Sequence, residues 1–103
     1  MTIQQLAQAL NGIADTAHIE FDAPPTAPYI AYYETPSQQI AADAKVLHEI
    51  KNITIEIYCR KNDYDTVDAV KRMLTEHLIV YDEVNIVWLN DLKLVETVLD
   101  ISL

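Results

Sequence analysis

The segment from residue 53 to residue 60 reads Ile53-Thr54-Ile55-Glu56-Ile57-Tyr58-Cys59-Arg60. An apolar side chain stands at every second position of its first seven residues. Successive side chains of a β-strand point to opposite faces of a sheet, so this alternation predicts a strand that is buried on one face and solvated on the other. The strand region is expected to start near Lys45, and Ile50, which is out of phase with the isoleucines, indicates a bulge or a change of face near Lys51 and Asn52.

After this strand the chain predicts one helix and a closing hairpin. Asp63, Asp65 and Asp68 suit a helix N-terminus, because carboxylates complement the positive end of the helix dipole. The helix is expected to present an apolar stripe of Val67, Val70, Met73 or Leu74, and Leu78. Residues 79–89 have the composition of a strand, and Asn90-Asp91 is a plausible turn. The last strand is predicted from a second alternating set, which consists of Val95, Thr97, Leu99 and Ile101.

Before residue 53 the pattern is less regular. Thr2 and Gln5 have the spacing of a capping box, and apolar residues at helical intervals predict a helix over residues 2–11 that stops at Asn11-Gly12. Residues 13–21 fit neither period. The proline-rich connector 22–28 is expected to be extended and without regular structure. A strand is predicted for residues 29–34, and a polar loop for residues 35–44.

These segments predict an α+β domain with the order α-β-β-α-β-β. The economical arrangement is a mainly antiparallel sheet of about four strands, with the helices packed on one face. A chain of 103 residues has room for one hydrophobic core, so residues 1–103 are expected to form a single domain with its main body at residues 29–103. Half of the residues are apolar and 22% are charged, which is typical of a folded chain.

The charge of the chain restricts its partners. Sixteen Asp and Glu against seven Lys and Arg give a net charge of −9, which repels nucleic-acid phosphates and anionic lipid surfaces. The acidity can keep the domain soluble, imitate DNA, or line a passage through which DNA slides. With one cysteine, no basic leader followed by an apolar run and no long apolar segment, the chain is expected to be a cytosolic protein without a membrane span.

No pattern of catalytic or ligand-binding residues is evident, so no enzyme activity, cofactor or metal is expected. His18, His48 and His77 lack metal-ligand spacing, and Cys59 is expected to be a small buried hydrophobe. Gly12 is the only glycine, which excludes glycine-rich loops that bind phosphate groups. Six tyrosines and Trp88 suit either cross-strand pairs in the sheet or a protein interface, and the former is favoured.

The run from Ala42 to Asp63 resembles a stretch in small tail-completion proteins of long-tailed bacteriophages and prophages. Those proteins carry a similar Asp-x-Lys-Val and Lys-x-Asn, then an Ile-Glu-Leu-Tyr followed by a charged Lys-x-Asp. In this chain the corresponding residues are Asp43, Lys45, Val46, Lys51, Asn52, Ile55, Glu56, Ile57, Tyr58, Lys61 and Asp63. The resemblance continues in outline through a helix and a closing hairpin and covers most of the chain after Pro28.

This resemblance implies a tail-terminator or head-tail joining protein. Members of that family form rings, often hexameric, that cap the tail tube and connect it to the head. The implied partners are further copies of the chain, the tail tube protein and a head-completion or connector protein, and DNA passes through without specific binding. The implied location is the cytoplasm of the bacterial host during assembly, and then the neck or tail of the virion.

The polar loop is long enough to project as a contact arm, and Ile40, Asp43 and Lys45 are the predicted interface or lumen residues. Two other functions stay open. An acidic inhibitor that imitates DNA would bind a basic partner in a salt-sensitive manner. An enzyme with an unrecognised carboxylate pair would show a deep pocket and raised carboxyl pKa values.

Overall fold

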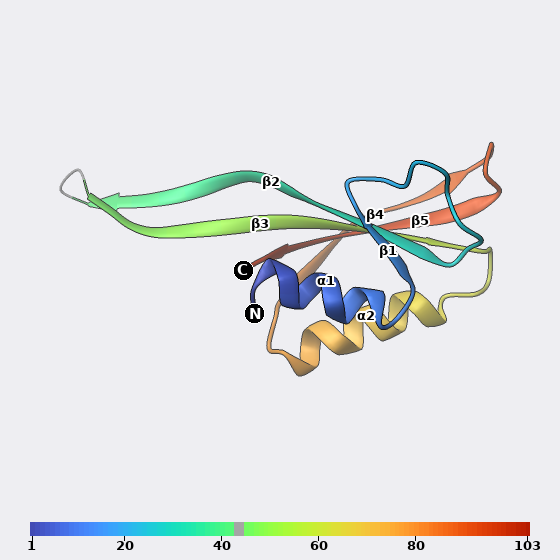
Figure 1. The fold of residues 1–103 in the computed structure, drawn as a ribbon, viewed down its shortest axis with the longest axis horizontal. Helices are drawn as coiled ribbons and strands as arrows, with labels where there is room; N and C mark the ends of the chain where they lie inside the picture. Colours follow the sequence, from blue (N-terminus) through green and yellow to red (C-terminus); the bar gives the residue numbers. More distant parts are fainter. Residues whose placement is uncertain (43–44) are drawn as a thin grey trace.

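A computed structural model describes the backbone of residues 1–42 and 45–103, and the side chains of residues 1–35 and 51–103. It contains two helices and five strands (Figure 1). In chain order the elements are α1 (Ile3–Asn11), β1 (Asp15–His18), β2 (Tyr29–Ala42), β3 (Lys45–Cys59), α2 (Asp65–Glu76), β4 (Tyr81–Leu89) and β5 (Leu94–Ser102).

The strands form one mixed sheet in the order β1-β2-β3-β5-β4. The α+β class and the mainly antiparallel sheet predicted from the sequence are confirmed, but the predicted number of about four strands and the order α-β-β-α-β-β are wrong, because the sheet has a fifth strand before Tyr29. The ambiguous segment after the first helix contains β1, which pairs parallel to β2 from Asp15 opposite Tyr29 to His18 opposite Tyr32. The three other strand pairs are antiparallel.

The predicted end signals of α1 are present. The Thr2 hydroxyl accepts a hydrogen bond from the Gln5 backbone N–H at 3.1 Å, and the Gln5 side chain accepts one from the Thr2 backbone at 2.8 Å. This reciprocal capping box satisfies two donors that a helix leaves without an internal partner. Gly12 is the C-cap, so the helix starts and stops where the sequence indicates.

Both helices cover the same face of the sheet (Figure 1). Leu6 and Leu10 of α1, and Val67, Val70 and Leu74 of α2, belong to one hydrophobic cluster with the sheet. The strand residues in that cluster are Ile30, Ile53, Ile55, Ile57, Cys59, Leu99 and Ile101. The alternation predicted for residues 53–59 therefore places four buried side chains against the helices.

Leu78 departs from the predicted apolar stripe of the second helix. The helix ends at Glu76, and Leu78 adopts a left-handed conformation with φ 58°, which turns its side chain away from the core. The side chain is 92% exposed. The prediction that Leu78 packs with Val70 and Leu74 is wrong, because the stripe continues only as far as the helical geometry does.

The prediction of a polar loop for residues 35–44 is also wrong for residues 35–42, which the structure describes. The backbone continues as strand β2 to Ala42, and β3 begins at Lys45 opposite Ala42. The register shifts between Thr35 and Gln38, which lie opposite Asn52 and Ile50. The irregularity predicted near Asn52 therefore exists, with the extra residue on the neighbouring strand. We call the described residues 36–42 and 45–50 the arm; it projects from one end of the body (Figure 1), and the molecule measures 51 × 27 × 22 Å.

Candidate assembly surface

The arm is a two-stranded ribbon that emerges where the rest of the sheet stops. Pairing of β1 with β2 ends at Tyr32, and pairing of β5 with β3 ends at Asn52 opposite Ser102. Of the predicted interface residues, Ile40 lies in β2 opposite His48, and Lys45 is the first residue of β3. Asp43 lies outside the described residues, as do the side chains of Ile40 and Lys45. The role of these three residues in an interface or lumen therefore stays a prediction.

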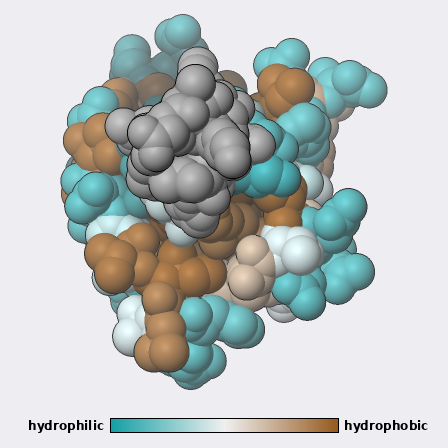
Figure 2. Space-filling view, turned by 90° about the vertical axis from the view of Figure 1, so that its left-hand side faces the viewer, coloured by the Kyte–Doolittle hydropathy of each residue, from teal (hydrophilic) through white to brown (hydrophobic). Residues whose placement is uncertain are grey.

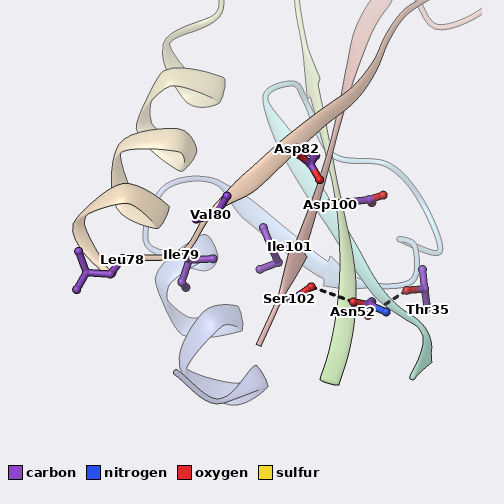
Figure 3. Close-up of a pocket in the computed structure, with 9 residues that line it drawn as sticks. All are labelled: Thr35, Asn52, Leu78, Ile79, Val80, Asp82, Asp100, Ile101 and Ser102. Atoms are coloured by element: carbon purple, nitrogen blue, oxygen red, sulfur yellow. Dashed lines mark hydrogen bonds between the residues drawn. The ribbon is translucent and has the colours of Figure 1, made fainter. Parts of the chain in front are cut away.

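A pocket of about 630 Å³ opens beside the root of the arm (Figure 3). Its lining residues are Thr35, Asn52, Leu78, Ile79, Val80, Asp82, Asp100, Ile101 and Ser102. The Thr35 hydroxyl donates to the Asn52 carbonyl at 3.3 Å, and the Ser102 hydroxyl donates to the Asn52 side-chain oxygen at 2.9 Å. The first bond joins β2 to β3 at the root of the arm, and the second joins β3 to the end of β5. The pocket combines an apolar side with the carboxylates of Asp82 and Asp100.

The apolar side of the pocket is exposed. Leu78 is 92% exposed and Val80 is 85% exposed. Figure 2 looks onto the end from which the arm projects and shows a broad apolar area next to the arm residues. Scattered apolar residues are normal on a protein surface, but a contiguous area beside a projecting ribbon is typical of an interaction site.

We expect Leu78→Gly to raise the free energy of unfolding of the isolated chain by about 0.5–1 kcal/mol, because glycine adopts a positive φ without the steric cost that leucine carries. His77→Gly is the matched control. His77 has an ordinary φ of −92°, so glycine there should lower the free energy of unfolding. Urea denaturation of both variants measures whether each substitution raises or lowers the free energy of unfolding. A loss of stability in Leu78→Gly as large as that in His77→Gly would contradict this account of Leu78.

The edge strand β4 is the second exposed apolar feature. It is the last strand of the sheet and pairs on one side only, with β5. Val84, Ile86 and Trp88 are 55%, 61% and 46% exposed. An uncovered edge strand presents a row of backbone donors and acceptors that can pair with another chain. The sequence carries a signal for this feature, since these three residues alternate along the strand, but the alternation alone does not tell a buried face from an uncovered one.

The sheet face opposite the helices carries aromatic and acidic side chains. Tyr29 and Tyr58 are cross-strand partners whose rings stack with centroids 4.7 Å apart, and Phe21 contacts Tyr29 edge-on at 5.7 Å. The favoured sequence interpretation of the tyrosines, cross-strand pairing, is confirmed for this pair. On the same face the Thr54 hydroxyl donates to Asp100 at 2.8 Å.

Glu56 and Glu96 form a carboxyl pair on this face. The pKa of Glu56 is raised from 4.5 to about 7. Burial is the largest cause, a hydrogen bond to Glu96 and the negative charge of Glu96 act in the same direction, and the Tyr58 hydroxyl, which donates to Glu56 at 3.2 Å, acts in the opposite direction. A raised carboxyl pKa is the feature that the enzyme alternative predicts.

We expect Glu56→Gln to raise the free energy of unfolding at pH 8 by about 1–2 kcal/mol and to change it little at pH 4.5. The folded chain binds more protons at Glu56 than the unfolded chain between pH 4.5 and 7. The stability that this proton contributes is complete below pH 4.5 and is lost as the pH rises through 7. Glu76→Gln on the exposed surface is the control. Parallel pH profiles of Glu56→Gln and the unaltered chain in urea denaturation would contradict the prediction.

The histidines and the cysteine do not gather into a site in the described part of the chain. The His18 ring lies 5.3 Å from the Tyr32 ring, and His77 Nδ1 is 2.8 Å from the Met73 carbonyl oxygen. Cys59 is buried, as predicted, and burial raises the pKa of its thiol. No group of three or more metal-ligating side chains occurs among the described residues.

No protein-family model matches the chain, and the search of curated proteins finds no match. Neither helix of the described structure is long and apolar enough to cross a membrane.

Proposed function

We propose that this chain is a structural assembly protein of a long-tailed bacteriophage or prophage. Its proposed role is that of a tail terminator or head-tail connector subunit, which forms a ring of about six copies that caps the tail tube and joins it to the head. The observation that carries this proposal is the arm, a ribbon projecting from a small domain beside exposed apolar surface. The sequence resemblance between Ala42 and Asp63 supplies the biological setting.

The charge of the chain suits this role. A ring of subunits that each carry −9 presents a negative surface to DNA passing through it, and repulsion keeps the DNA from binding. Asp82 and Asp100 lie directly opposite each other on adjacent strands, and the Glu56–Glu96 pair lies on the same sheet face. This acidic face is the candidate lining of the passage.

The acid face also favours a second function, an inhibitor that imitates DNA. The two functions respond to salt in opposite directions. Self-association of like-charged subunits strengthens as salt screens their repulsion, whereas binding of an acidic mimic to a basic partner weakens. Sedimentation at low and high ionic strength therefore distinguishes the candidates.

The direct test is to add the purified chain to tail tubes assembled from the tube protein of the same genome. The proposal predicts that the chain binds at tube ends in electron micrographs and stops further elongation. Tubes that elongate unchanged, with no density added at either end, would overturn the assignment. A heat-unfolded sample of the chain is the control for non-specific effects.

A further inference from the structure

The arm lacks the third strand that a stable ribbon requires. In the described registers, residues 36–42 of β2 and residues 45–50 of β3 pair only with each other. A two-stranded hairpin alone is marginally stable in water, and three or more strands, or packing against another element, are needed for independent stability. Each strand of the arm thus presents an outer edge to a further strand.

The edge strand β4 also has a free edge, because it pairs on one side only, with β5. Tyr81–Leu89 contains no proline or lysine, the residues that commonly protect an edge, and its bulge lies in the first half, between Glu83 and Asn85. The second half is uninterrupted and carries Ile86 and Trp88. Its charged positions are Asp82 and Glu83, and Glu83 is neutralised by Lys71 at 2.8 Å.

Exposed apolar side chains concentrate next to this edge. Nine large apolar side chains are exposed among the described residues, and five of them fall within residues 78–88. They are Leu78, Val80, Val84, Ile86 and Trp88. A strand laid along β4 would cover its free backbone groups and would also bury these apolar side chains. Each Å² of apolar area removed from water stabilises the contact by about 25 cal/mol.

We propose that the arm of one copy lies along β4 of the next copy and extends its sheet by β-strand addition. This inference rests on the proposed function and identifies the contact between subunits. The lengths agree: seven residues on the β2 side of the arm span about 23 Å, and the nine residues of β4 span about 30 Å. The arm points away from its own β4 (Figure 1), so a second copy must supply it.

The contact joins two different surfaces, the arm and β4. Such a head-to-tail contact leaves a free arm at one end of the pair and a free β4 at the other, so it continues until a ring closes. Each element supplies what the other lacks: the arm gives β4 a neighbouring strand, and β4 gives the arm its third strand. This mutual fit favours a second copy over an unrelated partner.

Crosslinking tests the contact. Ile40→Cys on the arm and Ile86→Cys on β4 are made in separate chains, mixed with tube protein and treated with a short bismaleimide; the native Cys59 is buried. We expect several-fold more crosslinked dimer in this mixture than in a mixture of Ile40→Cys with Glu76→Cys on the exposed surface of α2. Equal yields, or a dimer formed by Ile86→Cys alone, would overturn the inference, since the latter means that two β4 edges pair.

A charge variant gives an independent readout. Ile86→Lys is expected to abolish the oligomer while leaving the fold intact, whereas Ile19→Lys, at an isoleucine of similar exposure (59% against 61%), should leave the oligomer unchanged. Rings that cap tubes despite Ile86→Lys would refute this contact and leave the proposed function standing. Absence of any oligomer of the unaltered chain, with or without tubes, would refute both.

Discussion

Replacing residues 36–50, which contain the arm, with Asn-Gly is expected to leave a folded monomer that no longer associates at any salt concentration. The replacement connects Thr35 to Lys51 and keeps the two backbone hydrogen bonds between Lys51 and Leu103, at 2.8 and 3.3 Å. Asn-Gly favours the tight turn that a short hairpin needs.

The measurement combines solution mass with urea denaturation. We expect the mass of one chain, in the presence or absence of tube protein, and a free energy of unfolding within about 1 kcal/mol of the unaltered chain. A ring that forms without the arm would contradict the proposed role of the arm. The matched control replaces Asn90-Asp91 with Asn-Gly, which changes an exposed turn elsewhere and should leave both measurements unchanged.

Leu6→Ala is expected to have the opposite pattern, a large loss of stability without a direct effect on the contact surfaces. Leu6 is fully buried in α1 and shares one cluster with Ile55 and Leu74. Truncating a buried leucine removes transfer free energy and leaves a cavity, so the free energy of unfolding should fall by about 2–4 kcal/mol. In a domain of this size the melting temperature should fall by about 10–20 °C.

Gln4→Ala, at an exposed position of the same helix, is the control and should change the stability by less than about 0.5 kcal/mol. The contrast with the arm is informative: fifteen residues are expected to be removable at little cost in stability, and one leucine side chain is not. A small effect of Leu6→Ala would mean that α1 is a detachable segment rather than part of the core.

The sequence predicted the elements whose signals are local. The period of two over residues 53–59 gave the buried face of β3, and the Thr2–Gln5 spacing gave the start of α1. It did not predict β1, because four residues are too few to show a period, and the strand exists through parallel pairing with distant β2. Pro36 and the polar residues after it favoured a loop, whereas pairing with β3 keeps the backbone extended.

The candidate surface was less predictable. The sequence indicated a projecting segment at residues 35–44, where the structure has one, but not that it is a ribbon or that a pocket lies at its root. Its role as a contact stays a prediction. That pocket brings together Thr35, Asn52, residues 78–82 and residues 100–102, which only the sheet topology makes neighbours. The position of Leu78 followed from where the helix ends, a boundary that periodicity locates poorly.

The most direct test of the central claim, that this chain assembles with itself, is its solution mass by light scattering on a sizing column, with and without tube protein. The account predicts a closed oligomer near six copies, about 70 kDa for a chain of 11.7 kDa, either alone or in the presence of the tube. A mass of one or two copies that does not respond to tube protein would contradict it.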